Sequence, residues 1–302
     1  MSATTPVFLL NGAPADDPAA LRALAQVNYG HFTSLQVRGG AARGLALHLA
    51  RLAEGTAVLF DATLDEAAVR GWMRDAAAAA GGDGSMRVTV FSRGFDFRRP
   101  LQPVAIDVLV AVSALPPAPR ALRVQTRSFL RPVPQLKHVG TFPLFHHRRE
   151  ALKAGYDDAL FVDGEGQGAR VAEGSVWNIG FWDGRQVVWP QAPALRGTTE
   201  CLLQAGLEAA GVGQVVRPVT VAELGSFQAA FAANANGLQP ILAIDGIEYS
   251  PDAWADLGGL LQEALGRAPW EVLQAPGTPP RLAAGLNAPP DAVQLGLSAP
   301  RR

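Results

Sequence analysis

The sequence predicts an α+β fold in two domains, a smaller N-terminal α/β domain and a larger C-terminal domain. The chain has 302 residues, 48% of them hydrophobic, which is enough to bury one large core or two medium ones. Strand-like segments with alternating apolar residues are mixed with segments of helical periodicity along the chain. A proline-rich segment between two strand-like segments, residues 114–120, predicts an interdomain linker.

These observations give the expected boundaries. The N-terminal domain covers residues 1–113 and the C-terminal domain covers residues 121–267. The remaining residues, 268–302, are rich in Pro, Gly and Ala and show little periodicity. Because prolines at this density block both strand ladders and helices, we expect a loosely packed or disordered tail there.

Composition excludes several classes of partner. Basic and acidic residues nearly balance, 26 against 27, and the net charge is -1, so no field favours nucleic acid or an anionic membrane. The only cysteine, Cys201, excludes an internal disulfide and a multi-cysteine metal site. No apolar run is long enough to span a bilayer, and the N-terminus does not resemble a signal peptide. We therefore expect a cytoplasmic protein that acts on small molecules.

Local patterns predict the elements of the N-terminal domain. Alternating apolar residues predict strands, and apolar residues at helical spacing, with Gly-Gly ending the second segment, predict helices. The expected strands are residues 7–13, 30–37, 86–92 and 106–112, and the expected helices are residues 45–53 and 65–80. His48 and Arg51 lie on or near the buried face of the first helix. From the pattern alone, His48 is as readily a packed helix residue as a functional one.

Two residues further along the chain have the chemistry that a pyridoxal phosphate site requires. Lys137 follows a segment with two prolines, residues 131–136, which favours an extended backbone, and it precedes a predicted helix, residues 143–154. Glu173 ends the second strand of a predicted hairpin whose turn is residues 163–168. A pyridoxal phosphate site needs an amine to form a Schiff base and an acid beside the ring nitrogen. The pattern alone is also compatible with two ordinary surface charges.

A third segment suits a phosphate. Gly197, Thr198 and Thr199 precede a predicted helix, residues 200–210, so unpaired backbone N–H groups, two hydroxyls and the positive end of the helix dipole meet there. Thr198 would serve equally well as a plain N-cap. The adjacent pair His146 and His147 is interpreted as a solvated helix face, because neighbouring helical residues point about 100° apart. We expect no metal site.

Six short motifs occur in the order and at about the spacing of the class IV aminotransferase family, which this chain resembles over roughly residues 5–250. The motifs are Tyr29-Gly30 with Phe32-Thr33, then His48-Leu49-Ala50-Arg51-Leu52, Leu136-Lys137, Ala154-Gly155-Tyr156-Asp157-Asp158-Ala159-Leu160 with Phe161-Val162-Asp163, Glu173-Gly174-Ser175 with Asn178, and Leu195-Arg196-Gly197-Thr198-Thr199.

The resemblance implies a fold-type IV pyridoxal phosphate enzyme, with a pseudo-barrel C-terminal domain and a homodimeric assembly. It implies that Lys137 is catalytic and that Glu173 pairs with the pyridine nitrogen, while Asn178 is structural. The implied cofactor-binding set is Arg51, Lys137, Glu173, Gly197, Thr198, Thr199 and Asn234. Asn234 stands where the family often has threonine or serine. The implied substrate pocket contains Tyr29, Phe32, Gln36, Phe142 and Ala235.

The sequence also departs from the family pattern. Phe142 replaces a tyrosine of the branched-chain enzymes, and Glu200 replaces an arginine. The leading expectation is an aminotransferase that moves an amino group between an amino acid or amine and a 2-oxo acid. The alternatives are an aminodeoxychorismate lyase-like enzyme that releases pyruvate, which the Lys137-His138 pair resembles, and a catalytically altered family member. Candidates for binding a substrate carboxylate are Arg38, Arg93 and Arg98.

Overall fold

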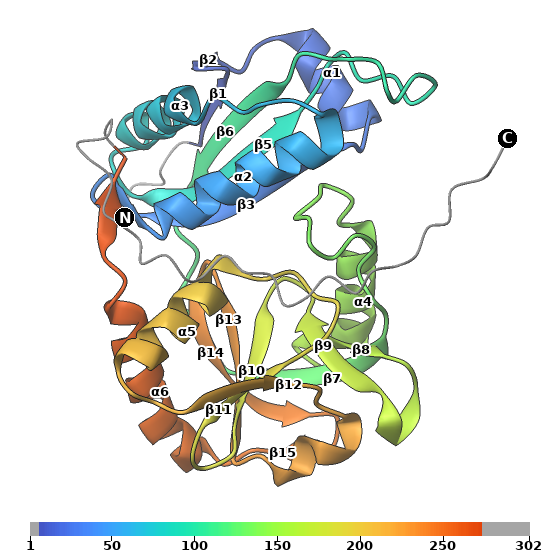
Figure 1. Cartoon of the computed structure of the whole chain (residues 1–302), viewed down its shortest axis with the longest axis vertical. Coiled ribbons are helices and arrows are strands. Elements are labelled where there is room, and N and C mark those ends of the chain that lie inside the picture. Colours follow the sequence, from blue (N-terminus) through green and yellow to red (C-terminus); the bar gives the residue numbers. More distant parts are fainter. Residues whose placement is uncertain (1–5, 274–302) are drawn as a thin grey trace, which may run out of the picture.

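The computed structural model describes residues 6–273 and contains two large sheets, one above the other in Figure 1, and a separate two-stranded sheet. The upper sheet has five strands and the lower one has nine. Helices and strands are mixed in both parts, so the predicted α+β fold is confirmed. The chain passes from the upper sheet to the lower one between Ser113 and Leu122.

The N-terminal sheet has the strand order β2-β1-β6-β5-β3. Its strands are β1 (Val7–Leu10), β2 (Ala13–Pro14), β3 (Gly30–Val37), β5 (Gly84–Phe91) and β6 (Asp107–Ser113). Every pairing in it is antiparallel. Two helices, α2 (Leu45–Phe60) and α3 (Glu66–Ala79), pack on this sheet, and the alternating apolar residues predicted for the strands form the core between them.

Helix boundaries follow from local capping. The Asp65 carboxylate accepts a hydrogen bond from the Ala68 N–H, so α3 begins where the sequence predicts. The second predicted helix therefore agrees closely, but α2 continues seven residues beyond the predicted end at residue 53, to Phe60. A helix that the sequence analysis did not predict, α1 (Pro18–Gln26), begins at Asp17, whose carboxylate accepts hydrogen bonds from the Ala19 and Ala20 N–H groups.

The C-terminal sheet has the order β12-β11-β10-β13-β14-β7-β8-β9, with β15 paired to β14. It curls in the manner expected of a pseudo-barrel (Figure 1). Its strands are β7 (Leu122–Ser128), β8 (Asp158–Asp163), β9 (Arg170–Gly174), β10 (Asn178–Trp182), β11 (Val187–Pro190), β12 (Gln214–Arg217), β13 (Ala229–Asn234), β14 (Gly237–Ile244) and β15 (Ile247–Glu248). Buried aromatic side chains belong to the two hydrophobic clusters that pack against this sheet. Phe181 lies in one cluster, and Trp189 and Phe231 lie in the other, together with residues of the covering helices.

Three helices pack on this sheet. The helix α4 (Phe142–Lys153) contacts β7 and β8, whereas α5 (Thr198–Ala209) and α6 (Pro251–Gly266) contact each other and β13. The prediction of a solvated face is correct for His146, which is exposed, and wrong for His147. His147 is half-buried, with its ring 4.8 Å from that of Phe129 and 5.7 Å from that of Phe161, so this position is packed rather than solvated.

The end of the described chain returns to the N-terminal domain. The strand β16 (Trp270–Val272) pairs with β4 (Ala41–Arg43), and Leu273 is 1% exposed within the N-terminal core. We call residues 270–273 the strap. The prediction of a loosely packed tail from residue 268 is wrong for the strap, because its backbone pairs with β4, which pairs with no other strand within residues 6–273. The rest of the predicted tail, residues 274–302, lies outside the described residues.

The approach to Lys137 also differs from the prediction. Residues 131–136 make turns rather than an extended run, with Val133 at φ 48° and the Leu136 N–H donating to the Val133 carbonyl at 3.0 Å. The extension predicted from the two prolines is therefore wrong, and tertiary contacts override it. The Phe32 N–H donates to the Lys137 carbonyl at 2.9 Å, which attaches this loop of the C-terminal domain to β3.

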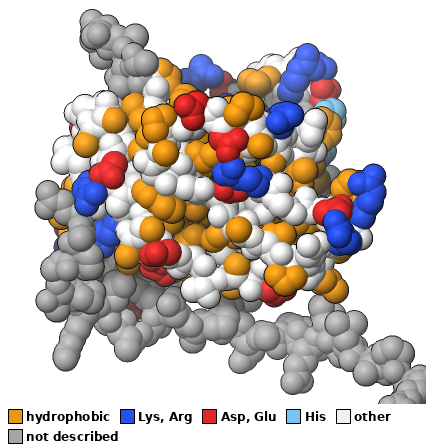
Figure 2. All heavy atoms as spheres, turned by 90° about the horizontal axis from the view of Figure 1, so that it is seen from above, with side chains coloured by type: hydrophobic (Ala, Val, Ile, Leu, Met, Phe, Trp, Pro, Cys, Tyr) orange, Lys and Arg blue, Asp and Glu red, His pale blue; other side chains and the backbone are white. Residues whose placement is uncertain are grey.

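Charge is spread over the surface. Viewed from above the N-terminal domain, acidic and basic side chains are interspersed among apolar and neutral ones (Figure 2). Within residues 6–273, no helix is both long and apolar enough to cross a membrane.

Candidate active site

Lys137 lies between the two domains, where its loop meets the edge strand β3. Two main-chain hydrogen bonds bracket it: Phe32 N–H to the Lys137 carbonyl and Val139 N–H to the Gly30 carbonyl, both 2.9 Å. Its Nζ lies 5.0 Å from the centroid of the Phe32 ring. The backbone of Lys137 is thereby fixed by one domain while its chain neighbours belong to the other.

The Lys137 amine is surrounded by charged groups of mainly positive sign. Burial, followed by the positive charges of Arg51 and Arg131, lowers the pKa of Lys137 to about 7, and Glu173 opposes this shift. An ordinary lysine is protonated at neutral pH and cannot act as a nucleophile. Lys137 is therefore available as a neutral amine near pH 7, as a Schiff-base lysine requires.

Glu173 lies at the end of β9, where it is 3% exposed. Its carboxylate accepts two hydrogen bonds from Arg131, at 2.9 and 3.2 Å, and one from the Leu195 N–H at 3.3 Å. Burial raises the pKa of Glu173, whereas the Arg131 guanidinium lowers it. A carboxylate offers about four lone-pair positions, so one remains for a further N–H donor such as a protonated ring nitrogen. The sequence analysis did not identify Arg131 as part of the site.

The phosphate segment has the predicted local structure. The helix α5 begins at Thr198, with Gly197 at its N-cap and no side chain capping it. The Thr198 hydroxyl is buried and has no hydrogen-bond partner among the described residues. A Cβ at position 197 would lie 2.0 Å from Asn178 Oδ1, so glycine is required there. Asn178 itself donates to the Leu195 carbonyl at 2.6 Å, which agrees with a structural role.

The other residues predicted at the phosphate gather nearby. Arg51, on α2, donates to the Arg196 carbonyl at 2.9 Å, next to Gly197. The Thr199 hydroxyl donates to the Asn234 carbonyl at 2.8 Å. His48 is 4% exposed and shares a hydrogen bond of 2.6 Å with the Thr33 hydroxyl, and burial lowers its pKa to about 3. His48 is therefore a neutral, packed side chain beside the site.

An interdomain pocket, which we call the phosphate-end pocket, joins these groups. It lies between β3, β4 and α2 on one side and α5, the β13–β14 turn and the strap on the other. Its lining comprises Leu35, Gln36, Arg43, His48, Thr198, Thr199, Leu202, Asn234, Ala235, Asn236, Gly237, Leu265 and Trp270. Most of its polar groups come from residues that the sequence predicted, and Arg43 and Asn236 are additions.

The predicted substrate-pocket residues are only partly brought together. Phe32 is 7% exposed beside Lys137, and Gln36 and Ala235 line the phosphate-end pocket. Tyr29 packs away in the N-terminal core, where its hydroxyl donates to the Leu59 carbonyl at 3.0 Å. Phe142 is 75% exposed and stacks on His146, with ring centroids 5.7 Å apart, so this protomer alone does not bring it to Lys137.

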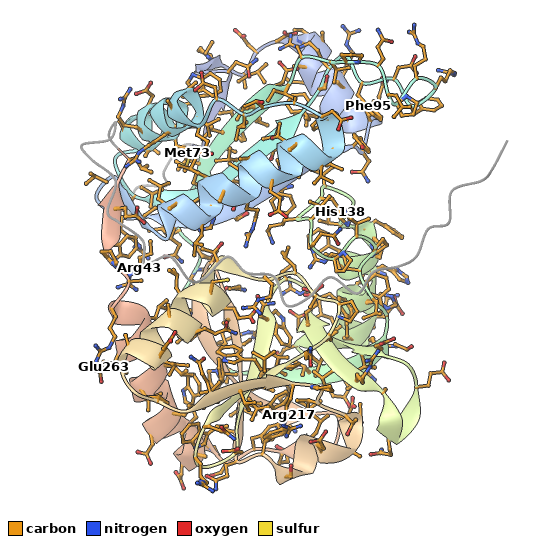
Figure 3. All side chains as sticks on the ribbon, viewed as in Figure 1. Arg43, Met73, Phe95, His138, Arg217 and Glu263 are labelled. Carbon is orange, nitrogen blue, oxygen red and sulfur yellow. The ribbon has the colours of Figure 1, made fainter. Side chains whose placement is uncertain are left out.

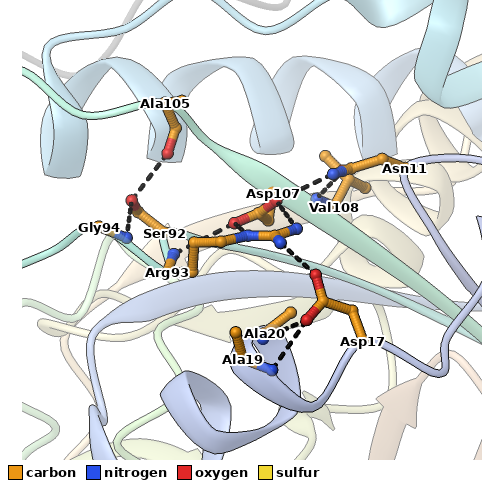
Figure 4. Close-up of polar contacts among 10 residues, drawn as sticks. All are labelled: Asn11, Asp17, Ala19, Ala20, Ser92, Arg93, Gly94, Ala105, Asp107 and Val108. Carbon is orange, nitrogen blue, oxygen red and sulfur yellow. Dashed lines mark hydrogen bonds and ion pairs between the residues drawn. The ribbon is translucent and has the colours of Figure 1, made fainter.

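The three arginines considered for carboxylate binding are engaged elsewhere. Arg93 pairs with Asp107 and with Asp17, in the network shown in Figure 4. Arg38 donates to Gln36 at 3.2 Å in an exposed turn, and Arg98 lies over the ring of the exposed Phe97. None of the three is among the charges that act on the Lys137 amine.

Arg87, which the sequence analysis did not consider, lies in the site instead. Its guanidinium lies 3.5 Å from the centroid of the Phe32 ring, and its positive charge contributes to the lowered pKa of Lys137. Burial lowers the pKa of Arg87 as well. The signal that could have found it is its register in β5, where it pairs with Ser34 of β3, close to the Phe32-Thr33 motif.

Glu200, the departure from the family pattern, lies inside the first turn of α5. It is 7% exposed, its nearest basic group is Arg196 Nε at 3.4 Å, and burial raises its pKa. An acid is tolerated at a helix N-terminus because the dipole is positive there. Its position nevertheless adds a buried carboxyl close to the phosphate segment.

The residues present fit pyridoxal phosphate. One interdomain region of the described chain brings three features together. They are a half-buried lysine with a lowered pKa, a buried carboxylate with one free acceptor position, and an uncapped helix N-terminus with an unpaired threonine hydroxyl. A second hydroxyl without a partner among the described residues, that of Ser175, is fully buried two residues after Glu173. Unpaired buried donors are rare in folded proteins and call for a ligand or ordered water.

Comparison with known proteins points the same way. The family model described as Amino-transferase class IV matches residues 30–244. The structure is similar to a branched-chain aminotransferase from the thermophilic archaeon Thermoproteus uzoniensis, with TM-score 0.74 and 20% identity over 87% of this chain and 96% of that one.

Two further solved structures are similar. A hypothetical aminotransferase from Mycobacterium tuberculosis in its PLP-bound form has TM-score 0.69 and 22% identity over 86% of this chain and 99% of that one. The 4-amino-4-deoxychorismate lyase from Pseudomonas aeruginosa has TM-score 0.69 and 27% identity over 85% of this chain and 98% of that one. A search of curated protein sequences gave no significant match.

Proposed function

Because this chain belongs to the class IV aminotransferase family, whose cofactor is pyridoxal 5'-phosphate, we propose that it is a transaminase. It transfers an amino group between an amino acid or amine and a 2-oxo acid. The observation that carries the proposal is that the Lys137 amine lies in the same interdomain region as the Arg131–Glu173 pair and the uncapped start of α5, with its pKa lowered to about 7.

The site residues have distinct roles in this proposal. When bound, the cofactor supplies a ring that accepts the electron pair left when a bond to the substrate Cα breaks. Glu173 would accept a hydrogen bond from the ring nitrogen at its remaining acceptor position, and Arg131, which donates two hydrogen bonds to Glu173, would keep the carboxylate oriented. Lys137 Nζ would take up the proton of the substrate Cα and later release it. Thr198 and Thr199 at the start of α5, together with Arg51, would hold the phosphate.

Arg87 is the arginine best placed for a substrate carboxylate. Its guanidinium lies 3.5 Å from the centroid of the Phe32 ring, Lys137 Nζ lies 5.0 Å from the same centroid, and the positive charge of Arg87 acts on the amine. An arginine binds a carboxylate through two parallel N–H donors.

We also propose that the enzyme is a homodimer. The resemblance to class IV enzymes implies a pocket completed by a neighbouring protomer, and apolar side chains are available for such a contact. Phe142 and Phe145 at the start of α4 are 75% and 49% exposed, and Phe97 and Leu101 are exposed in the loop after β5. Large exposed apolar groups that cluster on a surface are typical of interaction sites.

The reaction is tested with the purified holoenzyme and a panel of amine donors, using 2-oxoglutarate or pyruvate as the acceptor. We expect both products of amino transfer for at least one donor–acceptor pair. The variant Lys137→Ala should lose the long-wavelength absorbance of the lysine-bound cofactor and all transfer. The other lysine of the chain, Lys153, cannot replace it, because it is exposed on α4 and pairs with Glu150.

A parallel assay distinguishes the lyase. Pyruvate released from aminodeoxychorismate without any acceptor, together with no transfer across the panel, would replace the transaminase by the lyase. Failure of the wild-type protein to bind the cofactor at all would overturn both reactions and favour an altered family member.

A further inference from the structure

The phosphate-end pocket contains an arginine that the cofactor site described above does not use. Arg43 lines this pocket together with Thr198 and Thr199, the residues that begin α5. It belongs to β4, and Figure 3 shows it at the opposite end of the interdomain region from His138, the neighbour of Lys137. Arg43 is thus placed at the phosphate end of the site and not at the reacting end.

The backbone beside Arg43 is in contact with the phosphate segment. A Cβ on the next residue, Gly44, would lie 3.1 Å from Thr198 Cγ2 and 3.1 Å from Leu202 Cδ1. Gly44 also has φ 63°, a conformation that favours glycine. The chain can therefore pass close to the start of α5 and bring the arginine to the same pocket.

Two buried donors in this pocket have no partner among the described residues. Thr198 is 6% exposed and its hydroxyl has no hydrogen-bond partner within residues 6–273, and the same holds for the buried Arg43 Nε. A buried donor that is left unpaired costs free energy, so an acceptor is expected at this place. Both donors suit a phosphate oxygen.

The strap holds Arg43 in place. The Arg43 guanidinium carbon lies 4.9 Å from the centroid of the Trp270 ring, and Trp270 and Arg43 are register partners in the β4–β16 pair. The next strap residue, Glu271, accepts a hydrogen bond from the Leu45 N–H at 3.0 Å and so occupies the N-terminus of α2. Arg43 itself makes no ion pair within residues 6–273, which leaves its charge available.

The charge balance of this end favours a second arginine. Glu200 places a buried carboxyl in the first turn of α5, and the Arg51 guanidinium already donates to a main-chain carbonyl. A phosphate monoester carries close to two negative charges at neutral pH. Because Arg196 faces Glu200 at 3.4 Å, Arg51 alone would balance only about one of these two charges.

We propose that Arg43, positioned by Trp270 of the strap, is a second arginine for the phosphate group of pyridoxal phosphate. The ligand is a phosphate monoester, and the contact acts on binding rather than on the chemical step. The proposal rests on cofactor binding but not on which reaction the enzyme performs, so it stands whether the transaminase or the lyase is correct.

The test compares Arg43→Gln with Arg70→Gln in the full-length apoprotein. Arg70 is a matched control because it also contacts the strap, donating to the Val272 carbonyl at 2.8 Å, yet it does not line the pocket. Dissociation constants are measured by absorbance titration with pyridoxal phosphate and with pyridoxal, which lacks the phosphate. Inorganic phosphate is added to the pyridoxal titrations.

We expect Arg43→Gln to weaken pyridoxal phosphate about tenfold or more relative to Arg70→Gln, the loss typical of one charge-assisted hydrogen bond, and to leave pyridoxal unchanged. Inorganic phosphate should tighten pyridoxal binding to the wild type and to Arg70→Gln, but less to Arg43→Gln.

Two results would overturn the proposal. One is equal pyridoxal phosphate affinity in the two variants. The other is an equal loss for pyridoxal and pyridoxal phosphate, which would mean that Arg43 only packs the strap. If thermal unfolding shows that Arg43→Gln is not folded, Arg43→Lys takes its place in the titrations. Arg43→Lys must then lower the affinity for pyridoxal phosphate more than the affinity for pyridoxal. Equal losses of affinity for the two ligands would again reject the contact.

Discussion

At the scale of single residues, the candidate site depends on how its charges are buried together. Lys137 is half-buried among Arg51, Arg131 and Arg87, with Glu173 as the carboxylate that raises its pKa. Arg131 is committed to Glu173 by two hydrogen bonds, so it neutralises the acid and leaves the lysine repelled by the remaining guanidinium groups. A neutral amine next to an excess of positive charge suits a negatively charged cofactor and substrate.

This arrangement predicts a pH dependence of stability in the apoprotein. The pKa of Lys137 is lowered to about 7 in the folded state, whereas the pKa of a lysine in the unfolded chain is about 10.4. Between these values the unfolded chain binds a proton that the folded chain does not, so stability rises with pH, by at most about 1.4 kcal/mol per unit. Urea unfolding at pH 7, 8 and 9 should show this rise in wild type relative to Lys137→Met.

The comparison with Lys137→Met isolates the lysine from other groups that titrate in this range. Burial raises the pKa of Cys201, for example, so its titration lowers the free energy of unfolding as the pH rises above 8. This effect is the same in both proteins. A constant difference in unfolding free energy between the two proteins from pH 7 to 9 would show that the amine keeps its ordinary pKa.

At the scale of elements, α5 has two tasks at once. Its first turn presents the N–H groups proposed to bind the phosphate, and its middle packs against α6 so closely that a Cβ at Gly206 would lie 2.1 Å from the Ala264 carbonyl oxygen. Close backbone approach of this kind fixes the axial position of the helix. The position of Thr198 in the site therefore depends on the contact between two helices.

Gly206→Ala should consequently destabilise the protein by about 1–3 kcal/mol, because the methyl group meets a backbone atom that cannot rotate away. Gly259→Ala on the exposed face of α6 is the matched control, since no atom lies within 4 Å of its Cβ position. Replacing a glycine in a helix with alanine there should be neutral or stabilise by up to about 1 kcal/mol. Denaturant unfolding measures both, and equal stabilities would show that the two helices can separate without cost.

At the scale of the whole molecule, the two domains are connected twice. The chain crosses once between β6 and β7 and again at the strap, where β16 pairs with β4 and Leu273 enters the N-terminal core. Lys137 and the phosphate-end pocket lie between these two connections. The relative position of the domains, and so the geometry of the site, is constrained on both sides.

The proposed homodimer predicts a solution mass of about twice 31.7 kDa by light scattering. The double variant Phe142→Ser, Phe145→Ser should shift the protein toward the monomer, since it removes exposed apolar surface and little core packing. Val58→Ser, at a similarly exposed position on α2, is the control and should leave the mass unchanged. A monomeric wild type would reject the dimer, and a dimeric double variant would place its interface away from α4.

Much of the fold followed from local patterns. The strand β3 spans the residues predicted for it, and α3 begins at the aspartate that caps it, because alternation and capping are properties of short segments. The strap and the turns before Lys137 were not predictable in this way. Each depends on a strand that lies far away in the sequence. The strap pairs with β4, and the loop that contains Lys137 is hydrogen-bonded to β3.

The sequence by itself determined the chemistry available to this protein, namely the lysine, the acid, the Gly-Thr-Thr helix entry and the family that contains them in this order. Only the tertiary structure decided that Arg131 holds Glu173, that the charge of Arg87 rather than Arg93 acts on Lys137, and that Arg43 lines the same pocket as Thr198. The physical reason is that pairing between charges depends on distance in space and on burial, and a linear sequence specifies neither.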